Sequence, residues 1–361
     1  MNARERIMAC LMGEEPDKIP VCAWDSLRTG SQGGWMRRLQ KRGLGRIRVF
    51  SPYKPAFHPM SPNPYLEDVK YTQIHYKEKG IIKYRQTFET PVGSITGIVR
   101  MNPAEVDVMH GGEEEFFVKE TADWRVVNYI FKGILDKLSP NYEAFERVED
   151  ELGDTGLTIG RIEKTPYQRA WVELAAIERA VIDFSEQPEE LLEYLEVQRQ
   201  LHTKIAEIVA ESPAKFLDII DHVTDMTPPK YYKEYCIPFY EIYGKALVGT
   251  GKTLGVHSDG RFGHLKKEIR EAPFTVVESL TMPPVGDVSL TEAKLAWPDK
   301  ILFINTPPHL AWAEPEKIKE GYQALAEEWG GKKGLLIEHS EEMPLERVEQ
   351  HLSITLDVFG Y

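Results

Sequence analysis

Two histidines and a glutamate end short apolar runs in the second half of the chain, and their side chains are of the kinds that bind zinc. His257 ends LGVH, Glu278 ends TVVE and His339 ends LLIEH. Two imidazole nitrogens and one carboxylate oxygen form a donor set that suits Zn²⁺. Asp259 offers either a fourth ligand or a hydrogen bond that fixes an imidazole tautomer. The alternative is that these residues bind a substrate carboxylate or hydrogen-bond to one another.

Arg161 ends another apolar run and offers a different chemistry. A guanidinium can hold a substrate carboxylate through two parallel hydrogen bonds. The competing interpretation is a salt bridge with Glu163 or Asp221. Asp259 and Asp221 are the acidic candidates for catalysis, since a carboxyl group whose pKa is raised by burial can donate a proton.

Further polar and aromatic residues lie where other runs end, and we expect them to bind substrate. They are Trp24, Asp25, Tyr53, His222 and Asn305, with Glu341 as a further acidic member. The remaining histidines fall in loops or on helix faces, where packing and surface roles are commoner.

Eight short β-branched runs are the elements that must position these side chains. We expect strands at 18–25, 46–50, 156–162, 215–222, 253–260, 275–281, 301–308 and 334–342. Amphipathic stretches such as 188–211 and 316–329 separate them and are long enough for parallel crossovers. Eight βα units predict an α/β fold, a (β/α)8 TIM barrel, and the glycine fingerprint of a doubly wound sheet is absent. We expect one barrel domain over 1–361, with the polar residues converging at the carboxyl ends of its strands.

Residues 51–118 break this rhythm. The segment starts with a proline-rich loop, and polar and apolar residues then alternate around Lys79-Gly80 and Pro91-Val92-Gly93, which predicts an inserted antiparallel β meander. Loops on the active face give barrels their specificity, so we expect 51–118 to cover the barrel mouth.

Composition restricts the partners. The 361 residues carry 44 Lys plus Arg against 57 Asp plus Glu, a formal charge of −13, which disfavours nucleic acid and anionic membranes. Three cysteines without a CxxC pair predict neither a disulfide framework nor a thiolate metal site. No apolar run reaches the length of a membrane span or a signal peptide, so a cytoplasmic protein is expected, and a homodimer is compatible with it.

Three segments carry a family resemblance over nearly the whole chain. RERIMACLMGEEPDKIPV at the start, GVHSDG in the middle and LLIEHSEEMPLERVEQHL at the end resemble the uroporphyrinogen decarboxylase superfamily. That resemblance implies a (β/α)8 barrel and two broad activities, decarboxylation in the heme pathway and corrinoid-dependent methyl transfer.

Departures from the two branches favour methyl transfer. Where decarboxylases of this superfamily carry an arginine-rich RQAGRY segment, this chain reads VCAWDSLRTG and keeps Arg28 alone. Where the thiol-methylating branch carries His-x-Cys and a later Cys, this chain has His257-Ser258-Asp259 and Glu338-His339. Loss of both thiolates leaves a harder zinc ion that favours oxygen substrates.

The resemblance therefore implies a zinc enzyme that moves a methyl group from a methoxylated compound, expected to be aromatic, to cob(I)alamin on a separate corrinoid protein. Two alternatives stay open at this point. One is a metal-free decarboxylase that uses Arg161 and Asp25 on a smaller acid. The other is a barrel that only binds a ligand.

Overall fold

The computed structural model describes the chain except residues 26–33, 58–65, 102–111, 341–342 and 344. Eight parallel strands close a barrel in the order β1-β14-β13-β12-β11-β10-β9-β2. Their bounds are β1 Val21–Trp24, β2 Gly45–Phe50, β9 Gly156–Ile162, β10 Phe216–Val223, β11 Thr253–Ser258, β12 Val276–Leu280, β13 Ile301–Asn305 and β14 Leu335–His339. The predicted TIM barrel is confirmed, and each predicted strand overlaps an observed one.

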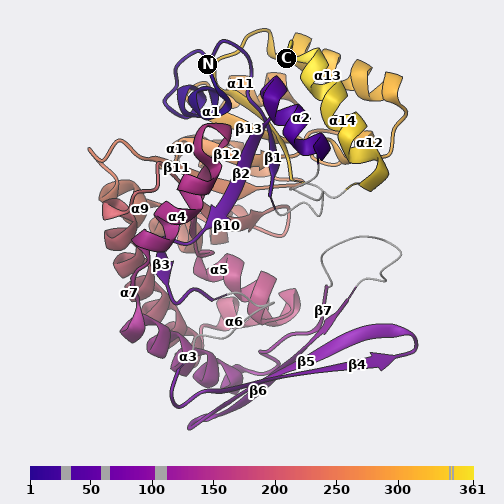
Figure 1. The fold of residues 1–361 in the computed structure, drawn as a ribbon. Coiled ribbons are helices and arrows are strands. Elements are labelled where there is room, and N and C mark those ends of the chain that lie inside the picture. Colours follow the sequence, from indigo (N-terminus) through magenta and orange to yellow (C-terminus); the bar gives the residue numbers. More distant parts are fainter. Residues whose placement is uncertain (26–33, 58–65, 102–111, 341–342, 344) are drawn as a thin grey trace.

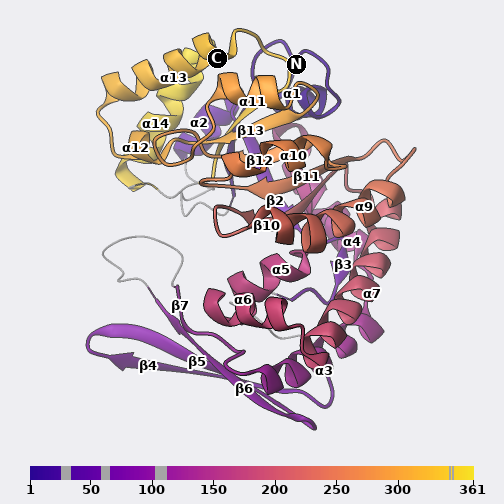
Figure 2. The same cartoon turned by 180° about the vertical axis from the view of Figure 1, so that it is seen from behind.

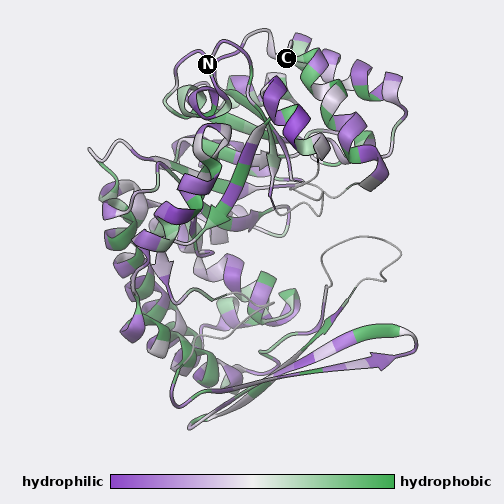
Figure 3. Cartoon of the chain, viewed as in Figure 1, coloured by the Kyte–Doolittle hydropathy of each residue, from purple (hydrophilic) through white to green (hydrophobic). Residues whose placement is uncertain are grey.

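Helices surround this barrel (Figures 1 and 2). Those of six residues or more are α1 Ala3–Leu11, α2 Gly34–Arg42, α3 Trp124–Lys137, α4 Tyr142–Leu152, α6 Ile177–Glu186, α7 Glu189–Glu211, α9 Ile237–Ala246, α10 Lys266–Glu271, α11 Leu290–Ala296, α13 Pro315–Trp329 and α14 Leu345–Val358. Shorter ones are α5 Pro166–Arg169, α8 Pro229–Tyr231 and α12 Pro308–Ala311, and two π-helical turns span Ala170–Leu174 and Tyr232–Cys236. In Figure 3, hydrophobic and hydrophilic residues alternate along α7, as expected for a helix with one buried face. Among the described residues, no helix is both long enough and apolar enough to cross a bilayer.

Strand alternation divides the barrel interior into an apolar and a polar layer. Side chains of successive strand residues point to opposite faces. The lower interior is an apolar cluster that α1 closes with Ile7, Cys10 and Leu11. Its strand members are Cys22, Ile47, Leu157, Ile159, Phe216, Val276, Ile301, Phe303 and Leu336. The next inward positions toward the carboxyl ends therefore form the polar layer.

The insert is a separate four-stranded antiparallel sheet, which confirms the predicted meander. Its order is β4-β5-β6-β7, from β4 Lys70–Glu78, β5 Ile81–Thr90, β6 Gly93–Arg100 and β7 Gly112–Glu115, and a small pair joins β3 Tyr53–Lys54 to β8 Ser139–Pro140. The sheet packs on α3 through β6, and α5 and α6 lie between the sheet and the barrel in both views (Figures 1 and 2). Both chain termini lie at the opposite end of the molecule. That 51–118 covers the mouth stays a prediction, because two of its loops lie outside the described residues.

His202 on α7 is a packing histidine that gives the fold a defined pH dependence. The Tyr243 hydroxyl lies 2.7 Å from its Nδ1, and its Nε2 lies 3.1 Å from the Lys164 carbonyl oxygen. Burial, reinforced by Arg169, lowers the pKa of His202 to about 3. A histidine with a lowered folded-state pKa stabilises the protein above its unfolded pKa of about 6.5 and loses that contribution as pH falls.

We therefore expect wild type to lose unfolding free energy on acidification relative to His202→Gln, which cannot titrate. The difference should reach about 3 kcal/mol between pH 7 and pH 4.5. Urea denaturation of both proteins at each pH measures it. Equal pH slopes for the two proteins would contradict the assignment.

Candidate active site

A layer of polar side chains occupies the carboxyl-terminal half of the barrel. On most strands, the member of this layer lies two residues after a side chain of the apolar cluster and points to the same inward side. On β11, which contributes no side chain to that cluster, the member is the residue at the same height in the barrel. The members on these strands are Trp24, Arg161, Asp218, His257, Glu278, Asn305 and Glu338. Trp24, Arg161, His257, Glu278 and Asn305 are thus five predicted site residues that share the inward-facing side.

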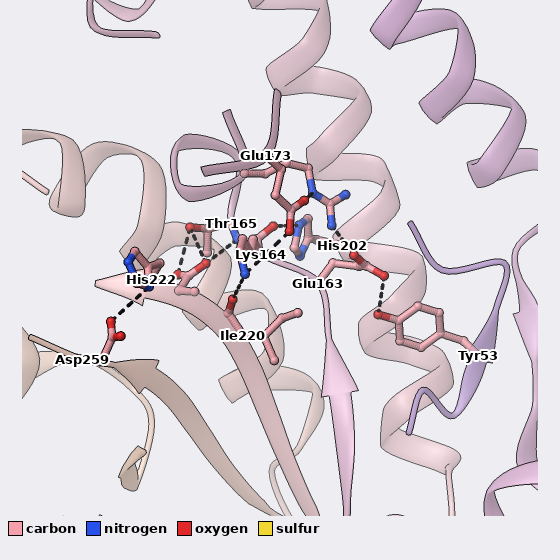
Figure 4. Close-up of polar contacts among 11 residues, drawn as sticks. Tyr53, Glu163, Lys164, Thr165, Glu173, His202, Ile220, His222 and Asp259 are labelled. Atoms are coloured by element: carbon pink, nitrogen blue, oxygen red, sulfur yellow. Dashed lines mark hydrogen bonds and ion pairs between the residues drawn. The ribbon is translucent and has the colours of Figure 1, made fainter. Parts of the chain in front are cut away.

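Among the described residues, His222, His257 and Asp259 form a group that could hold a metal ion. One donor atom from each lies within 4.8 Å of the other two. His222 Nδ1 is 3.1 Å from Asp259 Oδ1, a contact that Figure 4 shows, and His257 Nε2 is 4.0 Å from Asp259 Oδ2. A register shift in β10 between Ile219 and Val223 displaces the strand end that carries His222. Three protein ligands of the N, N, O type with a further position for substrate are typical of catalytic zinc sites.

Glu278 orients His257 from behind. Its buried Oε2 contacts His257 Nδ1, so the other ring nitrogen, Nε2, is the one turned toward Asp259. Burial alone would lower the pKa of His257, but the attraction of Glu278 outweighs it and raises the pKa to about 9. A carboxylate that holds the second nitrogen of a ligating histidine is a recurrent feature of zinc sites and raises ligand basicity. Glu278 was predicted as a zinc ligand. The structure instead places its carboxylate behind His257, where it would orient that ligand.

Glu338 extends this arrangement across the barrel. Its carboxyl group accepts hydrogen bonds from Trp24 Nε1 at 2.9 Å and from the Ser279 amide at 3.1 Å. Ser279 has a φ of 66°, an unusual value for a serine, which turns its amide onto Glu338. Burial, with the neighbouring Glu278, raises the pKa of Glu338 well above its ordinary value. The environment of Glu338, behind the His257–Glu278 pair, therefore favours the neutral form of its carboxyl group.

This geometry predicts the effect of Glu278→Gln. The amide cannot attract the imidazole as a carboxylate does, so zinc affinity should fall about 10- to 100-fold. Competition with a chromophoric chelator measures the affinity. Glu349→Gln is the matched control, because Glu349 pairs with Arg38 on the exposed surface. Equal zinc affinities for Glu278→Gln and wild type would exclude the orienting role.

His339 is not beside His257, and this corrects the predicted ligand set. His339 Nδ1 is 2.6 Å from Thr306 Oγ1, and its ring lies 5.3 Å from that of His351 on α14 and 6.1 Å from that of Tyr322 on α13. Since Glu338 faces inward, the next residue along the strand must face the outer helices. The prediction was one residue off in the strand alternation.

Three other predicted residues have partners away from the His222–His257–Asp259 group. Asp221 faces the outer helices and accepts hydrogen bonds from the Thr165 amide at 2.7 Å and the Tyr240 hydroxyl at 2.6 Å. Asp25 pairs with Arg46 and Arg48. Tyr53 is buried and donates to Glu163 Oε1 at 3.2 Å, on the far side of β9 from His222 and Asp259 in Figure 4. The structure does not bring these three to the His222–His257–Asp259 group.

Asn305 lies inside the barrel, with partners on two neighbouring segments. It donates to Ser279 Oγ at 3.1 Å and accepts from Ser340 Oγ at 2.8 Å. Glu341 lies outside the described residues. Asn305 therefore supports the strand ends around Glu278 and Glu338.

Several residues of the site were not predicted from the sequence. Asp218 and Glu338 lie within their strands, and the predictions considered mainly the strand ends. Trp171, whose ring lies 5.6 Å from that of His222, is on the π-helical turn Ala170–Leu174. Such turns often mark functional sites but have no clear sequence signal. The period-two alternation of LLIEH, in contrast, could have identified Glu338.

The chain is similar to known proteins in sequence and in fold. A family model described as uroporphyrinogen decarboxylase (URO-D) matches residues 115–358. A methyltransferase from Methanosarcina mazei shares the fold with a TM-score of 0.57 at 13% identity, covering 100% of both chains. A pneumococcal exo-β-D-N-acetylglucosaminidase structure gives a TM-score of 0.40 at 11% identity, over 98% of this chain and 86% of that one. No curated protein matches the sequence significantly.

Proposed function

This chain belongs to the uroporphyrinogen decarboxylase family, and we propose that within this family it is a zinc-dependent methyltransferase. The proposed reaction moves a methyl group from a methoxylated aromatic compound to cob(I)alamin on a separate corrinoid protein. The observation that carries the proposal is the His222–His257–Asp259 group at the carboxyl ends of the strands, a donor set without thiolates. The methyltransferase fold neighbour is compatible with this proposal.

The donor set fits zinc on two counts. The nitrogen and oxygen donors match those of catalytic zinc sites, and His257 has the carboxylate behind it that such ligands usually have. Zinc bound there would supply Lewis acidity toward the ether oxygen. Asp259 suits a ligand better than the proton donor considered from the sequence, because its contacts with His222 and His257 outweigh burial and lower its pKa.

The chain's own residues would hold the substrate and the protons. In the transfer, the carbon–oxygen bond of the ether breaks with its electron pair on oxygen, and Co(I) provides the pair for the new bond to carbon. Trp171 offers a ring face beside His222 for the aromatic donor. Asp218 and Glu338 are buried, and burial, with Glu278 nearby, raises the pKa of each carboxyl group well above its ordinary value. These two carboxyl groups are the candidates for holding a proton inside the barrel.

Decarboxylation of a smaller acid is the competing function, and the family description favours it. That alternative relied on Arg161 and Asp25 without metal. Asp25 is neutralised by Arg46 and Arg48, with oxygen–nitrogen distances of 2.7 and 2.8 Å. This pairing weakens the decarboxylase interpretation.

The deciding experiment mixes the protein, its metal content measured, with a corrinoid protein reduced to cob(I)alamin and a panel of methoxylated aromatics. Methyl transfer appears as the absorbance change to methylcob(III)alamin. Porphyrinogen is incubated in parallel, and released carbon dioxide is measured. Carbon dioxide release without methyl transfer from any donor would replace this proposal with the decarboxylase.

A further inference from the structure

Arg161 at the mouth of the barrel has an unpartnered hydrogen-bonding edge. Two residues beyond the inward-facing Ile159 on β9, it shares the inward side. Its Nε and Nη2 atoms are buried, and neither has a hydrogen-bond partner among the described residues. Buried charged nitrogens without partners are costly and require an explanation.

Of three carboxyl groups that could neutralise Arg161, two are engaged elsewhere and the third is not paired with it. Glu163 pairs with Arg169 and accepts from Tyr53. Asp221 is held by Thr165 and Tyr240. Asp218 is the register partner of Arg161 on β10, yet no hydrogen bond or ion pair joins the two. The internal salt bridges expected as an alternative role for Arg161 are therefore not formed.

Elsewhere the chain shows what this edge of an arginine does when a carboxylate is present. Arg46 donates from Nε to Asp25 Oδ1 at 2.9 Å and from Nη2 to Asp25 Oδ2 at 2.7 Å. Arg6 binds Asp17 through the same two atoms, at 2.6 and 3.0 Å. In Arg161 these same two atoms lack such a partner.

We propose that Arg161 binds a carboxylate on the methyl donor through Nε and Nη2, which makes the substrate a methyl ether that also bears a carboxylate. The methyl ether half of this inference rests on the proposed function, and the carboxylate half does not. Arg161 is partly exposed, and neither Nε nor Nη2 has a hydrogen-bond partner among the described residues. A change of side-chain torsion would therefore present this edge without breaking a hydrogen bond of these two atoms. Arg161 would hold the carboxylate end of the substrate, and the ether oxygen would then point toward His257. Fixing the substrate in this way would align its methyl group for transfer.

Calorimetric binding of a matched pair of ligands to the zinc-loaded protein tests the inference. The pair is 4-methoxybenzoate and 4-methoxybenzamide, which differ in the charge of one group. Wild type should bind the benzoate about tenfold or more tightly. Arg161→Gln should lose that preference, and Arg161→Lys should keep part of it, because a point charge cannot form the bidentate pair. Arg85→Gln, which removes an exposed arginine of the insert sheet, should keep all of it.

The outcomes separate this inference from the proposed function. A benzoate preference that survives in Arg161→Gln, for instance because the metal binds the carboxylate, overturns the inference. So does equal binding of the two ligands by wild type. A preference that disappears in Arg161→Gln supports it even if no methyl transfer is ever observed, and in that case only the proposed function fails. Should Arg161→Gln not fold, as judged by thermal melting, a full preference in Arg161→Lys overturns the bidentate contact and a reduced one supports it.

Discussion

His257→Ala is expected to remove nearly all bound zinc and to lower the rate of methyl transfer by about 10³-fold or more, equivalent to about 4 kcal/mol. His257 has the central place in the site, since its Nδ1 contacts Glu278 and its Nε2 faces Asp259. Alanine removes one of the three donors and leaves the buried Glu278 carboxyl group without the imidazole that it contacts. Elemental analysis of protein purified without chelator measures the metal, and the cobalamin absorbance measures the rate.

The control is His75→Ala, which deletes an exposed histidine on the insert sheet. It should retain both zinc and activity. Circular dichroism should show the same fold for both variants, because His257 lies outside the apolar cluster that fills the lower barrel. A full equivalent of zinc in His257→Ala, or less than about a tenth of an equivalent in wild type, would refute the zinc site.

Gly156→Ala should cause a large loss of stability. Gly156 pairs with Arg46 where β9 and β2 meet, and a Cβ added there would lie 2.1 Å from the Arg46 carbonyl oxygen. Backbone, unlike a flexible side chain, cannot move aside without disturbing the barrel. We expect a loss of about 3 kcal/mol or more in unfolding free energy.

Gly331→Ala is the matched control, because nothing lies within 4 Å of a Cβ built at that exposed position. It should change stability by less than about 0.5 kcal/mol. Denaturant unfolding of both variants measures the contrast. Equal stabilities would show that β2 and β9 separate more easily than the register implies.

The strands were predictable because each is a short β-branched run bounded by polar residues, and the bounds of β9 were predicted without error. The side-chain directions were harder, since an error of one residue moves a side chain to the opposite face. That is why Asp221 and His339 were expected at the mouth and instead face the helices. Period-two counting from Phe216 and Leu336 would have selected Asp218 and Glu338.

Other parts of the site depend on contacts that a single sequence does not encode. The position of His222 follows an irregularity in β10, and such local irregularities have no distinct composition. The contact between His257 and Glu278 joins residues 21 positions apart. The spacing between them does not reveal which atom of the imidazole the carboxylate would meet.

The placement of the two termini has a practical consequence for experiments on partner binding. The last residue is tied back to the amino-terminal segment, since the Tyr361 hydroxyl donates to the Ile19 carbonyl at 2.8 Å and Arg6 stacks on the Tyr361 ring. Both ends lie on the opposite side of the barrel from the insert sheet (Figures 1 and 2). An affinity handle or fluorescent label fused to either end should therefore leave the mouth accessible. Immobilising the protein through such a handle would present the candidate site to a corrinoid protein flowing over the surface.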